Sequence, residues 1–365
     1  MQKKLIALAI ASVFSAPAFA DNANFTFYGT ADVSYDSINT GNGTTTANGA
    51  TAVTGVTKQV VSSNVSKFGF KGSEDLGDGL SAIWQIEQQV NIDGFNTSSF
   101  ATRNTFAGLK SETMGTVLMG RHDTPYKIST RKLDVFGDNI ADNRSLMGNK
   151  SSAGFELRPT DVLAYISPAF AGVTAAIATV NLTETNTNNT QKKNSALSLA
   201  VMYDAAPFYG SVAYEKHKLE TVAAGANESA TRLGFGFKPE GFELGVVYEK
   251  TTDNLGAGQV NLNGHNAFYV SGKMNIGMSA VKLAYTKAGV LGTGAVQVVD
   301  SGASQVSVGY DHGLSKRTKL YALYTKISNG KGSNYQFSQS TAAATTTSGF
   351  GTSPSAISLG LKHTF

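Results

Sequence analysis

The chain has 365 residues and a formal net charge of +4, with 30 Lys and Arg against 26 Asp and Glu, and it contains no cysteine. This charge does not indicate a nucleic-acid partner, and without cysteine no disulfide can stabilise the fold. The 39 glycines, 20 phenylalanines and 14 tyrosines, with only 7 prolines, favour many strands joined by turns over disorder.

Residues 1–20 have the order of a secretory signal peptide. Lysines at positions 3 and 4 precede the apolar stretch 5–14, and Ala18-Phe19-Ala20 provides a cleavage site. The stretch is shorter than the roughly 20 apolar residues of a membrane-spanning helix, and no later segment approaches that length. We therefore expect export of the chain and a mature single domain over 21–365.

A strict two-residue period begins directly after this segment. Phe25, Phe27, Val33 and Tyr35 alternate with mostly polar neighbours, so one face of a strand would be apolar and the other polar. The same pattern recurs along the whole chain. It predicts sixteen strands, near 24–36, 62–73, 79–91, 102–110, 115–122, 157–167, 171–182, 193–204, 207–219, 229–238, 241–252, 262–275, 278–290, 302–311, 317–328 and 355–365.

Short and long connections alternate between these strands. Tight turns such as 205–207 and 238–241 are separated by long polar segments, for example 37–61, 122–156 and 329–354. Transmembrane barrels have this arrangement, and lipid cannot satisfy backbone amides, so the sheet must close. A soluble two-sheet sandwich is the alternative, but its connections need not alternate in this way. The pattern predicts an all-β fold, a sixteen-stranded antiparallel transmembrane β-barrel.

The last seven residues, Leu-Gly-Leu-Lys-His-Thr-Phe, form an amphipathic strand that ends on Phe365. This resembles the carboxyl-terminal signature of Gram-negative general porins, in the form found in their β-proteobacterial branch. The stretches 66–77, 103–110 and 164–172 are similar to motifs of the same family, so the resemblance covers essentially the whole mature chain.

The resemblance implies a homotrimer in the outer membrane, reached through the periplasm, in which each barrel passes small hydrophilic solutes and ions by passive diffusion. The implied partners are outer-membrane lipid and lipopolysaccharide, together with the outer-membrane insertion machinery, for which Phe365 would be the assembly signal. No cofactor is implied. The third long loop, 122–156, would fold inward and narrow the channel.

The resemblance also implies opposed charges at this narrowing. The expected basic wall residues are Lys67, Arg103, Arg121 and Arg158, and the expected acidic loop residues are Asp123, Asp134, Asp138 and Asp142. A charge on the lipid face costs roughly 2 to 4 kcal/mol near the bilayer midplane, which favours the lumen for the wall residues. For the loop acids, a solvated loop position is the alternative. The family's Pro-Glu-Phe-Gly stretch is absent from this loop, which carries five bases of its own.

No catalytic or metal-binding pattern is present. The five histidines are scattered without ligand spacing, and neither a nucleophile motif nor a phosphate-binding loop occurs. We therefore expect no enzyme. A general diffusion pore, a substrate-specific channel and a structural barrel or adhesin are the competing hypotheses. The loop 122–156 is charged and poor in aromatics, which favours the diffusion pore, and its balanced charges would leave the wall positive, which predicts mild anion selectivity.

Overall fold

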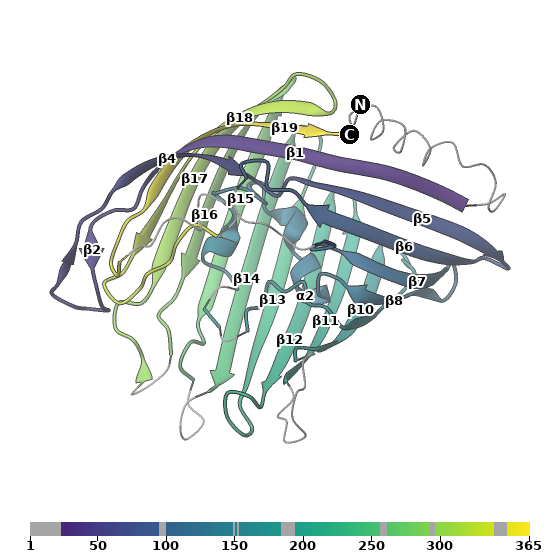
Figure 1. The fold of residues 1–365 in the computed structure, drawn as a ribbon, viewed down its shortest axis with the longest axis horizontal. Helices are drawn as coiled ribbons and strands as arrows, with labels where there is room; N and C mark the ends of the chain where they lie inside the picture. Colours follow the sequence, from purple (N-terminus) through teal and green to yellow (C-terminus); the bar gives the residue numbers. More distant parts are fainter. Residues whose placement is uncertain are drawn as a thin grey trace, which may run out of the picture.

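The alternating segments form strands, and each strand pairs antiparallel with the next one along the chain. The computed structural model describes residues 23–94, 100–148, 150–151, 153–183, 194–255, 261–292, 296–338 and 349–365. Within these ranges the first and last strands also pair, so the sheet closes into a barrel (Figure 1). The signal peptide expected over 1–20 lies outside the described residues, and the domain boundary at residue 21 stays a prediction.

Sixteen strands make the barrel wall, as the periodicity predicts. β4 and β5 both pair with β1, and together they form one long strand with an interruption between them. The wall consists of β1 (Ala23–Asn39), β4 (Thr57–Ser63) with β5 (Lys67–Gly77), β6 (Leu80–Gln89), β7 (Thr105–Ser111), β8 (Gly115–Arg121), β9 (Val162–Ile166), β10 (Val173–Asn181), β11 (Asn194–Ala205), β12 (Phe208–Leu219), β13 (Asn227–Phe237), β14 (Phe242–Asn254), β15 (Asn266–Ile276), β16 (Ser279–Ala288), β17 (Ala303–Gly313), β18 (Thr318–Asn329) and β19 (Ser355–Thr364).

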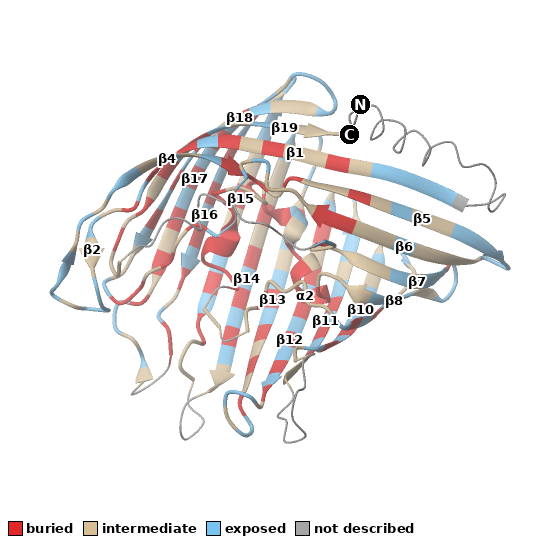
Figure 2. Ribbon diagram, in the orientation of Figure 1, coloured by how far each residue is buried: buried red, intermediate tan, exposed pale blue. Residues whose placement is uncertain are grey.

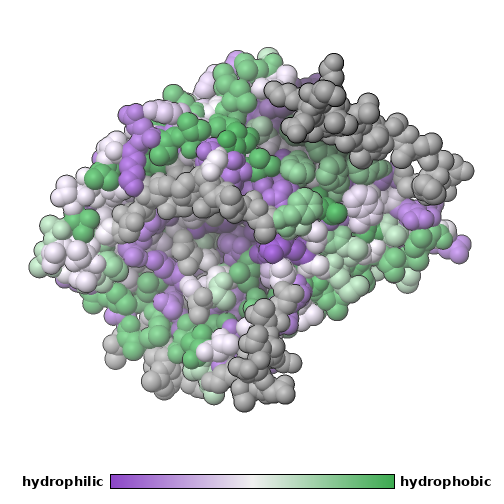
Figure 3. Space-filling view, in the orientation of Figure 1, coloured by the Kyte–Doolittle hydropathy of each residue, from purple (hydrophilic) through white to green (hydrophobic). Residues whose placement is uncertain are grey.

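Burial alternates along the strands with the same period of two (Figure 2). In β12, for example, Val212 and Tyr214 are exposed on the outside, whereas Ser211, Glu215 and His217 are buried on the inside. The outside of the barrel is therefore apolar and the inside is polar, which is the reverse of a soluble globular protein. Figure 3 shows the result: hydrophilic residues gather around the central hollow, and hydrophobic residues lie along the outside of the strands.

The interruption between β4 and β5 has a local cause. Val65 adopts a φ of 56°, in the left-handed region that a β-branched residue rarely occupies, and this breaks the ladder with β1. Ser66 repairs it: its Oγ accepts from the Asp32 amide at 2.9 Å and donates to the Asp32 carbonyl at 2.9 Å. The strand continues beyond this point to Thr57, so the first long loop is shorter than the expected 37–61. It carries the small hairpin β2 (Gly43–Thr44) and β3 (Ala52–Val53).

The ends of the wall meet at Gly29. The Gly29 amide donates to the Phe365 carbonyl at 2.9 Å, and the Phe365 amide donates to the Gly29 carbonyl at 3.1 Å. A Cβ at position 29 would lie 2.3 Å from Cζ of Phe365, so the aromatic ring lies directly on the glycine. Ring contact with Phe27, with centroids 5.7 Å apart, completes the closure.

The segment between β8 and β9 lies inside the barrel (Figure 1). It contains α2 (Pro125–Ile128) and two short 3-10 turns, η1 (Arg131–Leu133) and η2 (Asn143–Ser145). Its apolar side chains Tyr126, Phe136 and Phe155 are fully buried against the inner wall. These turns are too short to give a helical period in the sequence. Within the described ranges, no helix is long and apolar enough to cross a membrane.

Candidate functional site

Two expected wall bases meet at a carboxylate that the sequence analysis did not single out. Glu87 of β6 binds Lys67 of β5, with Nζ to Oε2 at 2.9 Å, and Arg103, with Nε to Oε1 at 2.6 Å. The Tyr28 hydroxyl donates to the same carboxylate at 3.0 Å. The signal for Glu87 was its parity, because it is out of phase with the outward-facing Trp84. Parity alone, however, does not identify its partners.

Asp123 forms the second group, at the start of the inward segment. It pairs with Arg158 at 3.0 Å and with Lys127 at 2.8 Å, and Asn104 accepts from Arg158 Nε at 2.9 Å. Burial alone would raise the pKa of Asp123, but the charges of Lys127 and Arg158 outweigh it and hold the pKa well below its ordinary range. Arg158 does not open a strand as expected near 157, because β9 begins at Val162 and Arg158 lies in the segment before it.

The loop contains a third, balanced group. Arg144 binds Asp138 at 2.6 Å and Asp142 at 2.7 Å, and Arg131 binds the same two carboxylates at 3.4 and 3.1 Å. Burial would raise the pKa of Asp138, but Arg131, Arg144 and, more weakly, Arg103 lower it. The positive charge of Arg103 on the wall therefore acts on Asp138 of the loop. The closest cations to both acids nevertheless belong to the loop itself.

Asp134 has a different environment. Its carboxylate accepts from the Tyr269 hydroxyl at 2.6 Å and from the amides of Phe136 and Asn143 at 2.8 and 3.0 Å, and it is buried against β15. Burial and the nearby negative charge of Asp142 raise the pKa of Asp134 to about 6. The structure thus places this residue as an anchor of the loop on the inner wall.

A second anchor was missed by sequence reasoning. Arg232 of β13 stands directly opposite Glu249 of β14 and pairs with it, and a second arm of the guanidinium binds Glu156 at 2.6 Å. The Tyr126 hydroxyl donates to Glu249 at 2.7 Å, and the Tyr126 ring lies 4.3 Å from the Arg232 guanidinium carbon. The signal was parity again, because Arg232 and Glu249 are out of phase with outward-facing Leu233 and Tyr248.

Arg121 ends β8 and has no carboxylate partner among the described residues; its Nη1 donates to the Arg158 carbonyl at 3.3 Å. The local charge balance follows. Glu87 is shared by two bases, Asp123 is shared by two bases, and the Arg131 and Arg144 group is neutral. Each wall group therefore carries an excess positive charge, and Arg121 adds another.

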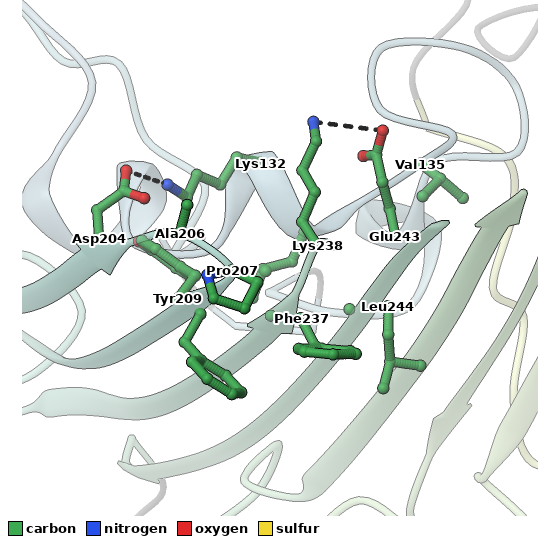
Figure 4. A pocket seen from close by; sticks show the side chains of 14 residues that line it. Lys132, Val135, Asp204, Ala206, Pro207, Tyr209, Phe237, Lys238, Glu243 and Leu244 are labelled. Carbon is green, nitrogen blue, oxygen red and sulfur yellow. Dashed lines mark hydrogen bonds and ion pairs between the residues drawn. The ribbon is translucent and has the colours of Figure 1, made fainter. Parts of the chain in front are cut away.

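A cavity of about 310 Å³ lies below the loop, between η1 and the short turns of β11 to β14 (Figure 4). Its floor is apolar and includes Phe237 and Leu244, whereas its rim carries two ion pairs, Lys132 with Asp204 and Lys238 with Glu243. The charges of each pair compensate each other, so the cavity is a gap under the loop and does not offer free charged groups to a ligand.

Among the described residues, no group of three or more His, Asp or Glu side chains could hold a metal ion. His217 lies between Glu215 and Glu228 at 2.8 and 2.7 Å, but its ring is stacked under Phe155 with centroids 4.7 Å apart and is fully buried. A buried, ion-paired histidine of this kind cannot reach a substrate in the lumen.

A closed barrel that is apolar outside and charged inside defines a transmembrane β-barrel protein of the outer membrane. The family model described as Gram-negative porin matches residues 7–332, and the chain belongs to this family. It is accordingly an outer-membrane channel protein and not an enzyme.

Relatives support the assignment over about nine-tenths of the chain. Major outer membrane protein P.IB of Neisseria lactamica is 28% identical over 339 residues, which are 91% of this chain and 95% of the relative. The P.IB protein of Neisseria meningitidis serogroup A, serotype 4A, is 29% identical over 344 residues, covering 92% and 95%. These relatives are major outer membrane proteins by name, in agreement with the predicted location.

Solved structures show the same fold. The anion-selective porin from Comamonas acidovorans superimposes with a TM-score of 0.74 at 23% identity, covering 94% of this chain and 100% of that one. OmpT of Vibrio cholerae in its trimer form gives a TM-score of 0.68 at 13% identity, covering 94% and 100%. At these identities the likeness establishes the sixteen-stranded barrel architecture.

Proposed function

We propose that the lumen is a general diffusion pore for small hydrophilic solutes and ions, narrowed between the loop 122–156 and the wall bases Lys67, Arg103, Arg121 and Arg158. The observation that carries this proposal is the sharing of single carboxylates by pairs of bases. Glu87 and Asp123 each face two cations, so the wall keeps positive charge that the loop acids do not neutralise.

Local charge controls the passage of ions in such a site. Low-dielectric walls focus the field, and screening acts only over roughly 8 to 10 Å at physiological salt. The anchor of Arg232 with Glu156 and Glu249 carries one negative charge, and Asp134 carries another. The groups around Glu87 and Asp123, together with Arg121, carry three positive charges. The balance is therefore positive, which favours mild anion selectivity. The name of the similar Comamonas acidovorans porin, which is called anion-selective, agrees with this sign.

Reversal potentials under a salt gradient test the proposal. Glu87→Gln removes the shared carboxylate and leaves Lys67 and Arg103 uncompensated, so anion selectivity should increase. Lys67→Gln removes one of the two bases and should reduce it. The two variants alter the same ion-pair group by one charge of opposite sign. A cation-selective wild type, or equal reversal potentials in both variants, would contradict the assignment of these residues to the constriction.

We also propose a homotrimer in contact with outer-membrane lipid and lipopolysaccharide. The support is an aromatic cluster on the outer face near the closure, in which neighbouring ring centroids lie 5.2 to 6.4 Å apart and which comprises Phe25, Phe27, Phe68, Phe70, Trp84 and Phe365. A contiguous aromatic patch of this kind is suited to a subunit contact. The similar OmpT of Vibrio cholerae was solved in a trimer form.

Phe365 is proposed as the signal read by the outer-membrane insertion machinery. Its ring is partly exposed on the outer face beside Phe27, so an external factor could contact it before the barrel closes. Its backbone is also the last pairing partner of Gly29. The recognition role and the structural role thus fall on one residue.

A further inference from the structure

Four lysines form a belt on the inner wall near the short-turn end of the barrel. They are Lys273 on β15, Lys282 on β16, Lys319 on β18 and Lys362 on β19. Each of them is next in sequence to an apolar residue that faces outward. Their side chains therefore point into the lumen, at the end of the barrel that also holds Phe365. This lysine belt is separate from the constriction groups, which lie between β5 and β9.

The register places these lysines face to face. Lys273 is directly opposite Lys282, and Lys319 is directly opposite Lys362. Like charges in directly opposed positions destabilise a sheet. The two pairs therefore impose a cost on the fold, and a negatively charged ligand between the exposed ammonium groups of Lys319 and Lys362 would offset part of it.

The carboxylates of the wall neutralise the belt only in part. Asp311 is shared by Lys282 at 2.8 Å and Lys319 at 2.7 Å, whereas Lys273 pairs with Glu243 at 3.0 Å and Lys362 with Asp32 at 3.3 Å. The ammonium-bearing side chains of Lys273, Lys319 and Lys362 remain 27, 39 and 32% exposed. They can therefore bind a further anion from the water of the lumen.

A cavity of about 350 Å³ is lined by Lys273, Lys319 and Lys362 of the belt and by the turn between β17 and β18, whereas Lys282 is buried outside this lining. That turn adds Lys316 and Arg317, which are exposed and form no ion pair within the described part of the chain. Asp311 is the only carboxylate among the residues that line the cavity, and both of its oxygens already face lysines. The cavity is thus strongly basic and has the size of a small-ligand site.

We propose that the lysine belt binds small organic anions that carry two or more negative charges, such as phosphate esters and dicarboxylates. A dianion can lie between two opposed ammonium groups and compensate both, whereas a chloride ion compensates one. The inference rests on the proposed diffusion pore, because the cavity is reached through the lumen. It deepens that proposal by naming a solute class and a second site along the path.

Single-channel recording with glucose 6-phosphate as the probe tests the belt. The probe is added to both chambers at constant chloride concentration, with uncharged glucose as the reference. We expect glucose 6-phosphate to lower the conductance in a saturable manner and glucose to have no such effect. In a Lys319→Gln, Lys362→Gln variant the apparent affinity should fall about tenfold, because two facing charges are lost.

A matched control removes the same two charges elsewhere. Lys287→Gln with Lys326→Gln changes exposed lysines on the outward face of β16 and β18, and this variant should keep the wild-type affinity. If the belt variant does not yield folded protein, Lys316→Gln with Arg317→Gln alters only the exposed turn and should still weaken the block severalfold.

The outcomes separate the two proposals. Saturable block that is lost in the belt or turn variant and kept in the control supports the site. Equal block in all variants, or equal block by glucose, would overturn it while the diffusion pore stands. A protein that inserts without conducting ions would overturn the pore itself.

Discussion

Asp134 makes the charge of the loop depend on the pH. Its carboxylate is buried beneath three donors, and burial together with Asp142 raises its pKa to about 6 from an ordinary value of 3.8. Between pH 3.8 and about pH 6, Asp134 is mostly protonated in the folded protein and mostly ionised in the unfolded chain. The contribution of Asp134 to the free energy of unfolding therefore decreases as the pH rises through this window.

This titration predicts a pH-dependent selectivity. As the pH falls through about 6, Asp134 loses its negative charge and the loop becomes more positive, so anion selectivity should increase. Asp134→Asn imitates the neutral form and should show the low-pH selectivity throughout, without the step. Reversal potentials recorded from pH 7.5 to 5 test this prediction. A variant that titrates like the wild type would assign the step to another group.

At the residue scale, strand parity is enough to show that Lys67, Arg232 and Glu249 point inward, because each is out of phase with the outward-facing apolar residues of its strand. It could not identify partners, because a partner depends on the register between strands. Glu87 joins Lys67 to Arg103 through positions that lie 20 and 16 residues apart along the chain. Arg158 contacts Asp123 at 3.0 Å, whereas Asp138 and Asp142 contact the loop's own arginines, and the opposition of wall bases and loop acids across a constriction stays a prediction.

At the scale of elements, the inward loop is held by side chains and not by backbone ladders. Tyr126 reaches Glu249, Tyr209 reaches the Ser129 carbonyl, and Tyr269 reaches Asp134. Contacts over such sequence separations leave no periodic signal, which is why the sequence could place the strands but not the path of the loop. The break at Val65 shifts the alternation by one residue, because Val61 lies opposite outward-facing Tyr35 whereas Phe70 lies opposite outward-facing Phe27.

Weakening one anchor should loosen the loop while the barrel stays folded. Glu249→Gln removes the charge that faces Arg232, and the lost charge-assisted hydrogen bonds should weaken the attachment by about 1.5–3 kcal/mol. We expect greater open-channel current noise in single-channel recordings. Tyr209→Phe is the control, because it deletes one neutral hydrogen bond and should have a smaller effect. Noise at the wild-type level in Glu249→Gln would mean that this anchor does not restrain the loop.

At the scale of the whole molecule, the proposed trimer predicts that a charged substitution disrupts the oligomer on one side of the barrel and not on the other. Phe27 and Phe235 both face outward and are 44 and 45% exposed, but only Phe27 belongs to the aromatic cluster. Phe27→Arg should give monomers in mild detergent, whereas Phe235→Arg should keep the oligomer, although both substitutions add a charge to the apolar face. Light scattering of the detergent complexes measures the mass. Identical masses for the two variants would place the subunit contact elsewhere.

The pairing of Gly29 with Phe365 also determines when the structure can form. The partner of β1 on this edge is β19, the last barrel strand in chain order, so β1 keeps one unpaired edge until β19 is available. An unpaired edge of this length is a template for association with other chains. Closure over more than three hundred residues is also entropically slow, because distant segments must meet before any contact rewards them. The barrel therefore remains open until β19 reaches β1, and it closes in a single late step.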